Sequence, residues 1–234
     1  SSFASTLQES GNKRAQMEVM VRKALVVGNF AAAVDCCIEA GLWPEALLLA
    51  QCGDQGLWTR TQSGFFEKHK QKLPFLSILN AVIKNELMDY VQGSDLDRWR
   101  ETLAVLSTYG KSDEFPGMCE TLGARLENEK MDFVSSALCY MCAANVPRAV
   151  AFWTAQLEAA NKAKGDLDID ALQKYVEKVV VFTQAHPGHP VSEETAANFA
   201  VYAALLAAQG RIAEAPRYLK DAKTPDKVLI DRLY

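Results

Sequence analysis

Residues 24–50 read ALVVGNFAAAVDCCIEAGLWPEALLLA, and this stretch decides the fold. Its apolar residues recur at helical spacing on both sides of short turns. Gly28 and Gly41 can each adopt a positive φ angle and end a helix. Asn29 can cap the next helix, and Pro44 suits the first turn of another. The sequence therefore predicts three consecutive helices joined by two tight turns.

The sequence motif of these turns, Gly-x-apolar-x-x-Ala, recurs further along the chain. Copies begin at Gly28, Gly41 and Gly210, and a fourth copy begins at Ala144 with alanine in the glycine position. The small residues Ala33 and Ala46 let neighbouring helices approach closely. Because the copies are unevenly spaced, a strict repeat such as the tetratricopeptide type is not expected. We predict an all-α chain, an irregular α-solenoid of stacked antiparallel helix pairs.

Composition sets the broad class of protein. The chain has 234 residues, of which 49% are hydrophobic and 23% charged, with a net charge of −4. No apolar run is long enough to span a membrane, so no membrane insertion is expected. No Lys/Arg cluster is interleaved with aromatic residues, so nucleic-acid binding is not expected either. Residues 1–12 are expected to be a disordered leader or the cut end of an expressed fragment, and residues 13–234 a single α-solenoid domain.

Four further segments carry specific expectations within roughly twelve to fourteen helices. Ser94 and Asp97 have the spacing of a capping box. Residues 133–144 are apolar nearly all round, which predicts the most buried helix of the chain. Residues 178–183 are rich in β-branched residues, but a lone strand could not satisfy its backbone, so a helix is expected. Thr224 and Pro225 predict the start of a last helix.

The cysteines and histidines offer little chemistry. Cys139 and Cys142 have a metal-ligand spacing, but a zinc site needs four ligands, and the adjacent pair at residues 36–37 points apart on a helix. The six cysteines are expected to be buried, reduced thiols, as in a cytosolic protein. His186 and His189 share a proline-fixed loop without a carboxylate partner, and His69 stands alone on a helix end. The sequence thus predicts no catalytic residue, no metal, no cofactor and no enzymatic activity.

Six blocks resemble a known family. They are residues 23–30 (KALVVGNF), 46–50 (ALLLA), 57–62 (LWTRTQ), 99–109 (WRETLAVLSTY), 119–126 (CETLGARL) and 137–143 (ALCYMCA). From about Val21 to Tyr234 the chain resembles the α-solenoid of the larger outer-cage subunit of the COPII vesicle coat. Two departures are Ala144 in the glycine position and the polar segment at residues 159–170.

The resemblance implies a fold called the ancestral coatomer element and a structural role. Such a solenoid forms the rod-like edge of the cage around vesicles that bud from the endoplasmic reticulum. The implied location is cytoplasmic, peripheral on endoplasmic reticulum exit sites and COPII vesicles. The implied partners include the small WD-repeat propeller subunit, bound mainly through a strand segment that this sequence lacks, and the inner coat, bound through regions that it also lacks. A nuclear-pore scaffold of the same fold stays open as an alternative, and an unrecognised enzyme is a third reading.

The resemblance also implies self-association as a two-fold homodimer. Several large apolar residues exceed what a two-layer stack is expected to enclose, and these are the candidate interface. They are Leu96, Trp99, Leu103, Leu106, Phe115 and Met118. Exchange of helices between the two copies is one route to such a dimer. The open alternative is that neighbours within the same chain cover these residues.

Overall fold

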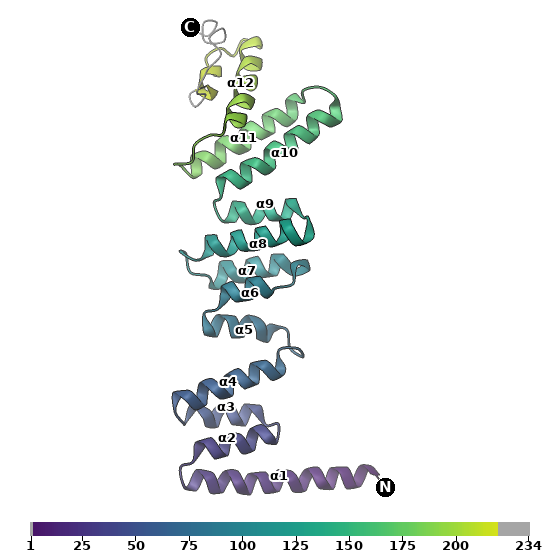
Figure 1. The fold of residues 1–234 in the computed structure, drawn as a ribbon, viewed down its shortest axis with the longest axis vertical. Coiled ribbons are helices and arrows are strands. Elements are labelled where there is room, and N and C mark those ends of the chain that lie inside the picture. Colours follow the sequence, from purple (N-terminus) through teal and green to yellow (C-terminus); the bar gives the residue numbers. More distant parts are fainter. Residues whose placement is uncertain (1, 220–234) are drawn as a thin grey trace. The chain divides into compact units, whose positions relative to one another are not determined.

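The computed structural model describes residues 2–219, with side chains from residue 14 onward (Figure 1). This part of the chain forms twelve α-helices and two short 3-10 helices, and it contains no strand. The predicted all-α solenoid is therefore confirmed. Contacts divide the chain into two compact units, Ser1–Glu86 and Leu87–Tyr234. The prediction of a single domain over residues 13–234 stays a prediction.

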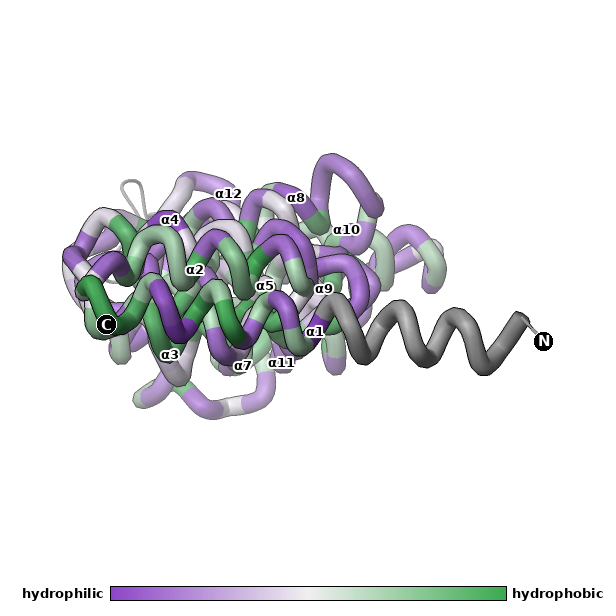
Figure 2. Tube along the Cα trace, turned by 90° about the horizontal axis from the view of Figure 1, so that it is seen from below, coloured by the Kyte–Doolittle hydropathy of each residue, from purple (hydrophilic) through white to green (hydrophobic). Residues whose placement is uncertain are grey.

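The first unit stacks consecutive helices, each packed on the one before it. Its members are α1 (Ser2–Val26), α2 (Phe30–Glu39), α3 (Trp43–Gln51), α4 (Gln55–His69) and α5 (Phe75–Lys84). Hydrophobic and hydrophilic segments alternate along individual helices such as α2 and α5, as amphipathic packing requires (Figure 2). The core joins α2 to α4 through Val34, Cys37, Ala46, Ala50 and Leu57.

Helix α1 begins earlier than expected. Its backbone is already helical at Ser2, whereas the sequence predicted a disordered leader over residues 1–12 and a first helix from about Lys13. Residues 2–12 contain no proline, so nothing in the backbone prevents the helix from extending through them.

The second unit is itself a stack, in which successive helices from α7 to α12 pack on one another. Its members are α6 (Leu87–Gly93), η1 (Leu96–Arg98), α7 (Trp99–Tyr109), α8 (Phe115–Lys130), α9 (Phe133–Cys142), α10 (Val146–Lys164), α11 (Ile169–Ala185), α12 (Glu193–Ala208) and η2 (Ala215–Tyr218). A large core cluster joins α10, α11 and α12 and includes Trp153, Leu172, Tyr175 and Phe199. Residues 178–183 lie inside α11, so the predicted helix there is confirmed. The last helix predicted from Thr224 lies outside the described residues.

The four predicted turns share one backbone geometry. The first residue of each copy has a positive φ angle: 71° at Gly28, 76° at Gly41, 82° at Gly210 and 54° at Ala144. In each turn the next amide donates back across the helix end, as Asn145 N does to Tyr140 O at 2.9 Å, which is the Schellman pattern. The closing alanines are fully buried in every copy: Ala33, Ala46, Ala149 and Ala215 are each 0% exposed. The repeated motif therefore specifies a residue with a positive φ angle that ends one helix, followed by a buried alanine at a close helix contact.

The predicted capping box at Ser94 is wrong by one residue. Asp95 is the cap, and its carboxylate accepts from Asp97 N at 2.9 Å. The helical segment opens with the 3-10 turn η1, whose tighter winding moves the capping position toward the C-terminus. The Ser94 hydroxyl instead donates to Val91 O at 2.9 Å, at the end of α6.

Candidate interaction surfaces

The six predicted interface residues come together in the second unit, on η1, α7 and α8, which contact one another. The structure covers most of them with neighbours from the same chain. Leu96, Trp99, Leu106 and Met118 are buried, and Leu103 and Phe115 are half-buried. A second copy could reach the four buried side chains only by exchanging helices, whereas Leu103 and Phe115 remain partly accessible. Their place in a dimer interface stays a prediction.

Helix α9 has the largest buried share of the described helices, with five of its ten residues buried, as expected. It is nevertheless not enclosed on every side. Phe133, Val134 and Leu138 are 53%, 59% and 41% exposed. The side of α9 that packs on α8 consists largely of small residues. At Gly123 of α8 an added Cβ would lie 3.2 Å from Ser136 O, so the two backbones are too close for large groups between them. The paired serines at 135–136 are the sequence signal that would have marked the buried side.

The expectation of buried thiols holds for only three of the six cysteines: Cys37, Cys119 and Cys139 are buried, Cys36 is half-buried, and Cys52 and Cys142 are exposed. Cys119 and Cys139 are fully buried on facing helices, and burial, with a smaller contribution from neighbouring thiols, raises the pKa of each to about 12. Across the described residues, no group of three or more His, Cys, Asp and Glu side chains is placed to hold a metal ion. That Cys139 and Cys142 bind no metal stays a prediction.

The histidines pack against aromatic rings in separate parts of the chain. His69 stacks on Phe65 with ring centroids 4.6 Å apart, and His186 meets Phe182 edge-on at 4.9 Å. His189 is exposed in the loop before α12. Within residues 2–219, no helix is long and apolar enough to cross a membrane.

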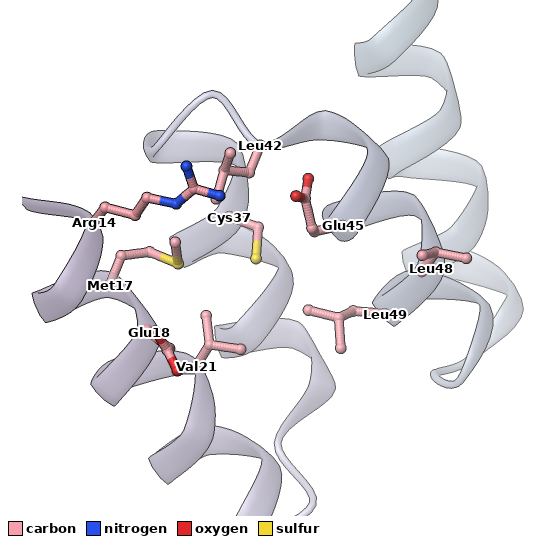
Figure 3. A pocket seen from close by; sticks show the side chains of 9 residues that line it. All are labelled: Arg14, Met17, Glu18, Val21, Cys37, Leu42, Glu45, Leu48 and Leu49. Carbon is pink, nitrogen blue, oxygen red and sulfur yellow. The ribbon is translucent and has the colours of Figure 1, made fainter. Parts of the chain in front are cut away.

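A pocket of about 390 Å³ opens between α1 and α3 (Figure 3). Met17 and Val21 of α1 and Leu49 of α3 point into the same space as Cys37 of α2. The walls are mostly apolar, with Leu42 and the 69% exposed Leu48 completing them. The sequence reasoning missed this feature. Its signal is the spacing of residues 14, 17, 18 and 21 on α1 and of residues 45, 48 and 49 on α3, which puts two stripes on facing helices.

Three charged groups stand around this pocket: Arg14, Glu18 and Glu45. Glu18 is paired with the exposed Arg22 guanidinium at 3.3 Å. Within residues 14–219 neither Arg14 nor Glu45 has an ion-pair partner. Burial first, then the Glu45 charge and the Cys36 thiol, raise the pKa of the Cys37 thiol at the pocket floor. The Glu45 charge thus acts on the interior of the pocket.

Comparison with protein families places both units in one known group. The model of the Sec16 Sec23-binding domain matches residues 21–225, which is most of the chain. The chain belongs to this family. Rat protein transport protein Sec31A is 40% identical over 224 residues, and the match covers 92% of this chain and 17% of the relative. The SEC31 protein of Dictyostelium discoideum is 31% identical over 242 residues, covering 94% and 18%.

The fold agrees with solved structures of the COPII coat. A structure described as the right-handed rod of the outer coat on membranes matches with a TM-score of 0.66 at 22% identity, covering 93% of this chain and 66% of that one. A second structure, of the COPII coat assembled on membranes, matches with a TM-score of 0.68, also at 22% identity, covering 93% of this chain and 33% of that one. The predicted resemblance to the outer-coat solenoid is confirmed. This family member spans less than a fifth of the length of the rat and Dictyostelium relatives.

Proposed function

We propose that the chain is a structural scaffold of the COPII outer coat, the solenoid that forms the rod-like edge of the cage around vesicles leaving the endoplasmic reticulum. The observation that carries the proposal is the 40% identity to Sec31A over 92% of the chain. The similarity runs through both compact units.

The experiment that tests this function is a segment exchange. The matching segment of full-length rat Sec31A is replaced by this chain, and the chimera is mixed with its coat partners on vesicles. We expect cages of the normal form by electron microscopy. A chimera that folds and reaches the vesicles but forms no outer cage would contradict the proposal, and an exchange with an unrelated helical segment is the control.

The two units are proposed to act as one solenoid domain over residues 13–234. The family model supports this because it extends from residue 21 in the first unit to residue 225 in the second. Self-association as a two-fold homodimer is part of the same proposal. Because the candidate residues on α7 and α8 are largely buried, exchange of helices is the form of dimer that would use them.

The partners follow from the same role. The small WD-repeat propeller subunit is proposed to bind chiefly through a strand segment outside this sequence, so this chain alone should bind it weakly. The family description names Sec23 binding, whereas the resemblance places inner-coat contacts outside this sequence. A pull-down with this chain measures how strongly it binds the WD-repeat propeller subunit and whether it binds Sec23. The proposed location is cytoplasmic, peripheral on endoplasmic reticulum exit sites and COPII vesicles, with no catalytic role, no cofactor and no nucleic-acid partner.

A further inference from the structure

Helices α1 and α3 both pack on α2, and the pocket of about 390 Å³ forms a groove between them (Figure 3). We propose that this groove binds a helical peptide segment of a partner protein, with apolar side chains on one face and a lysine or arginine beside them. Neither the coat role nor the dimer proposed above assigns a ligand to this surface.

The size and lining of the groove fit such a ligand. Well-packed interiors contain few voids larger than a water molecule, whereas ligand sites occupy roughly 300–1,000 Å³. Cys37 at the floor is 2% exposed, while Leu48 at the rim is 69% exposed, so the groove runs from the core to the surface. Apolar walls of this kind remove the apolar face of a ligand from water.

The shape of the groove favours a helix over a single small molecule. On α1 the lining residues fall at positions 14, 17, 18 and 21, and on α3 at positions 45, 48 and 49. These spacings give two straight stripes on helices that flank α2. Partner helices lie in apolar grooves of this form with side chains at the same spacings, and stacked helical proteins use such surfaces for binding.

The charges select a basic side chain. Glu45 lies on the α3 side of the groove, and it has no ion-pair partner among the described residues. Glu18 adds a second carboxylate, although Arg22 already pairs with it at 3.3 Å. Arg14 is the one cation among the lining residues, and it disfavours a base on the α1 side. A lysine or arginine of the ligand therefore belongs next to Glu45.

The test uses two designed peptides of about four helical turns, each with leucine at i, i+3, i+4 and i+7. One carries lysine beside the leucines, and the other carries glutamate at the same positions. Binding to the whole chain is followed by fluorescence anisotropy at low salt. We expect the lysine peptide to bind about five- to tenfold more tightly, with the difference shrinking at high salt.

Three variants locate the site. Glu45→Lys should reverse the preference between the two peptides. Glu86→Lys, which changes an exposed carboxylate outside the groove lining, should leave the preference unchanged. Leu48→Ser should weaken both peptides severalfold, and because Leu48 is exposed the variant is expected to keep its fold, as circular dichroism would verify.

Several results would overturn the proposal. The proposal fails if the two peptides bind equally, or if neither binds up to about 1 mM. It also fails if Glu45→Lys leaves the preference between the peptides unchanged. A dimer that Glu45→Lys or Leu48→Ser converts to monomer would instead assign the groove to a second copy of the chain. Failure of the proposed coat role would appear in cage assembly, which these titrations do not measure.

Discussion

Ala144 holds a backbone conformation that alanine rarely adopts. Its φ angle is 54°, and the other three turns have glycine at the same position. For a residue with a Cβ atom this conformation costs roughly 1–2 kcal/mol. The hydrogen bonds that end α9, from Ala144 N to Met141 O at 3.0 Å and from Asn145 N to Tyr140 O at 2.9 Å, hold it in place.

We therefore expect Ala144→Gly to stabilise the chain by about 0.5–1 kcal/mol, since glycine adopts this φ angle without strain. Chemical denaturation at a fixed protein concentration measures the change. Ala155→Gly, in the exposed middle of α10, is the matched control and should destabilise by about 1 kcal/mol. If both variants destabilise equally, Ala144 does not occupy the left-handed conformation.

Arg125 joins two helices of the second unit. Its Nη1 donates to Val91 O at 2.6 Å and to Ser94 O at 3.0 Å, at the end of α6, and its Nε donates to Glu129 Oε1 at 2.8 Å. The side chain is only 19% exposed, so these bonds are partly shielded from water. A lysine has no planar fork and cannot reproduce them together.

Arg125→Met should destabilise the chain by about 1.5–3 kcal/mol, the range for hydrogen bonds to charged groups, and Arg125→Lys should recover only part of this. Arg22→Met removes an ion pair whose arginine is 77% exposed and should change stability by less than about 0.5 kcal/mol. Denaturation curves for the three variants give the comparison. If Arg125→Met lowers the free energy of unfolding no more than Arg22→Met does, Arg125 does not stabilise the contact between α6 and α8.

At the scale of the elements, buried hydroxyls join α10, α11 and α12. Thr154 of α10 donates to the Tyr175 hydroxyl at 3.2 Å, and Tyr175 of α11 donates to Thr195 of α12 at 3.1 Å. All three residues are buried, so each hydroxyl depends on the others.

Tyr175→Phe should destabilise by about 1–3 kcal/mol because it leaves the Thr154 hydroxyl buried without an acceptor. Adding Thr154→Val should restore part of the loss, since both polar partners are then gone. A double-mutant cycle by denaturation measures the coupling. Additive losses would mean that the two hydroxyls do not interact.

The sequence predicted the elements better than the surfaces. The turns at Gly28, Gly41, Gly210 and Ala144 could be read because a left-handed residue and a buried alanine leave a local pattern. The cap at Asp95 was missed because the winding of η1 is not visible in the spacing. The open face of α9 and the burial of Trp99 depend on which neighbour covers which side, and a single helix pattern does not contain that information. The groove at Glu45 was missed for the same reason.

At the scale of the whole molecule, the account rests on two compact units that both match one family. Each helix contributes an apolar side to its neighbours, and several apolar groups remain uncovered, among them Phe133 and Leu138 on α9 and Phe75 on α5. Such surface is typical of a chain that completes its packing in an assembly. We propose that a second copy of the chain covers part of this surface.

The mass of the purified chain in solution tests this central claim most directly. Static light scattering at tens of micromolar should give twice the 25.8 kDa of one chain. The mass should not fall on modest dilution if the two copies exchange helices, because such an interface is large. A chain that remains folded and gives the mass of a single copy across this concentration range would contradict the account.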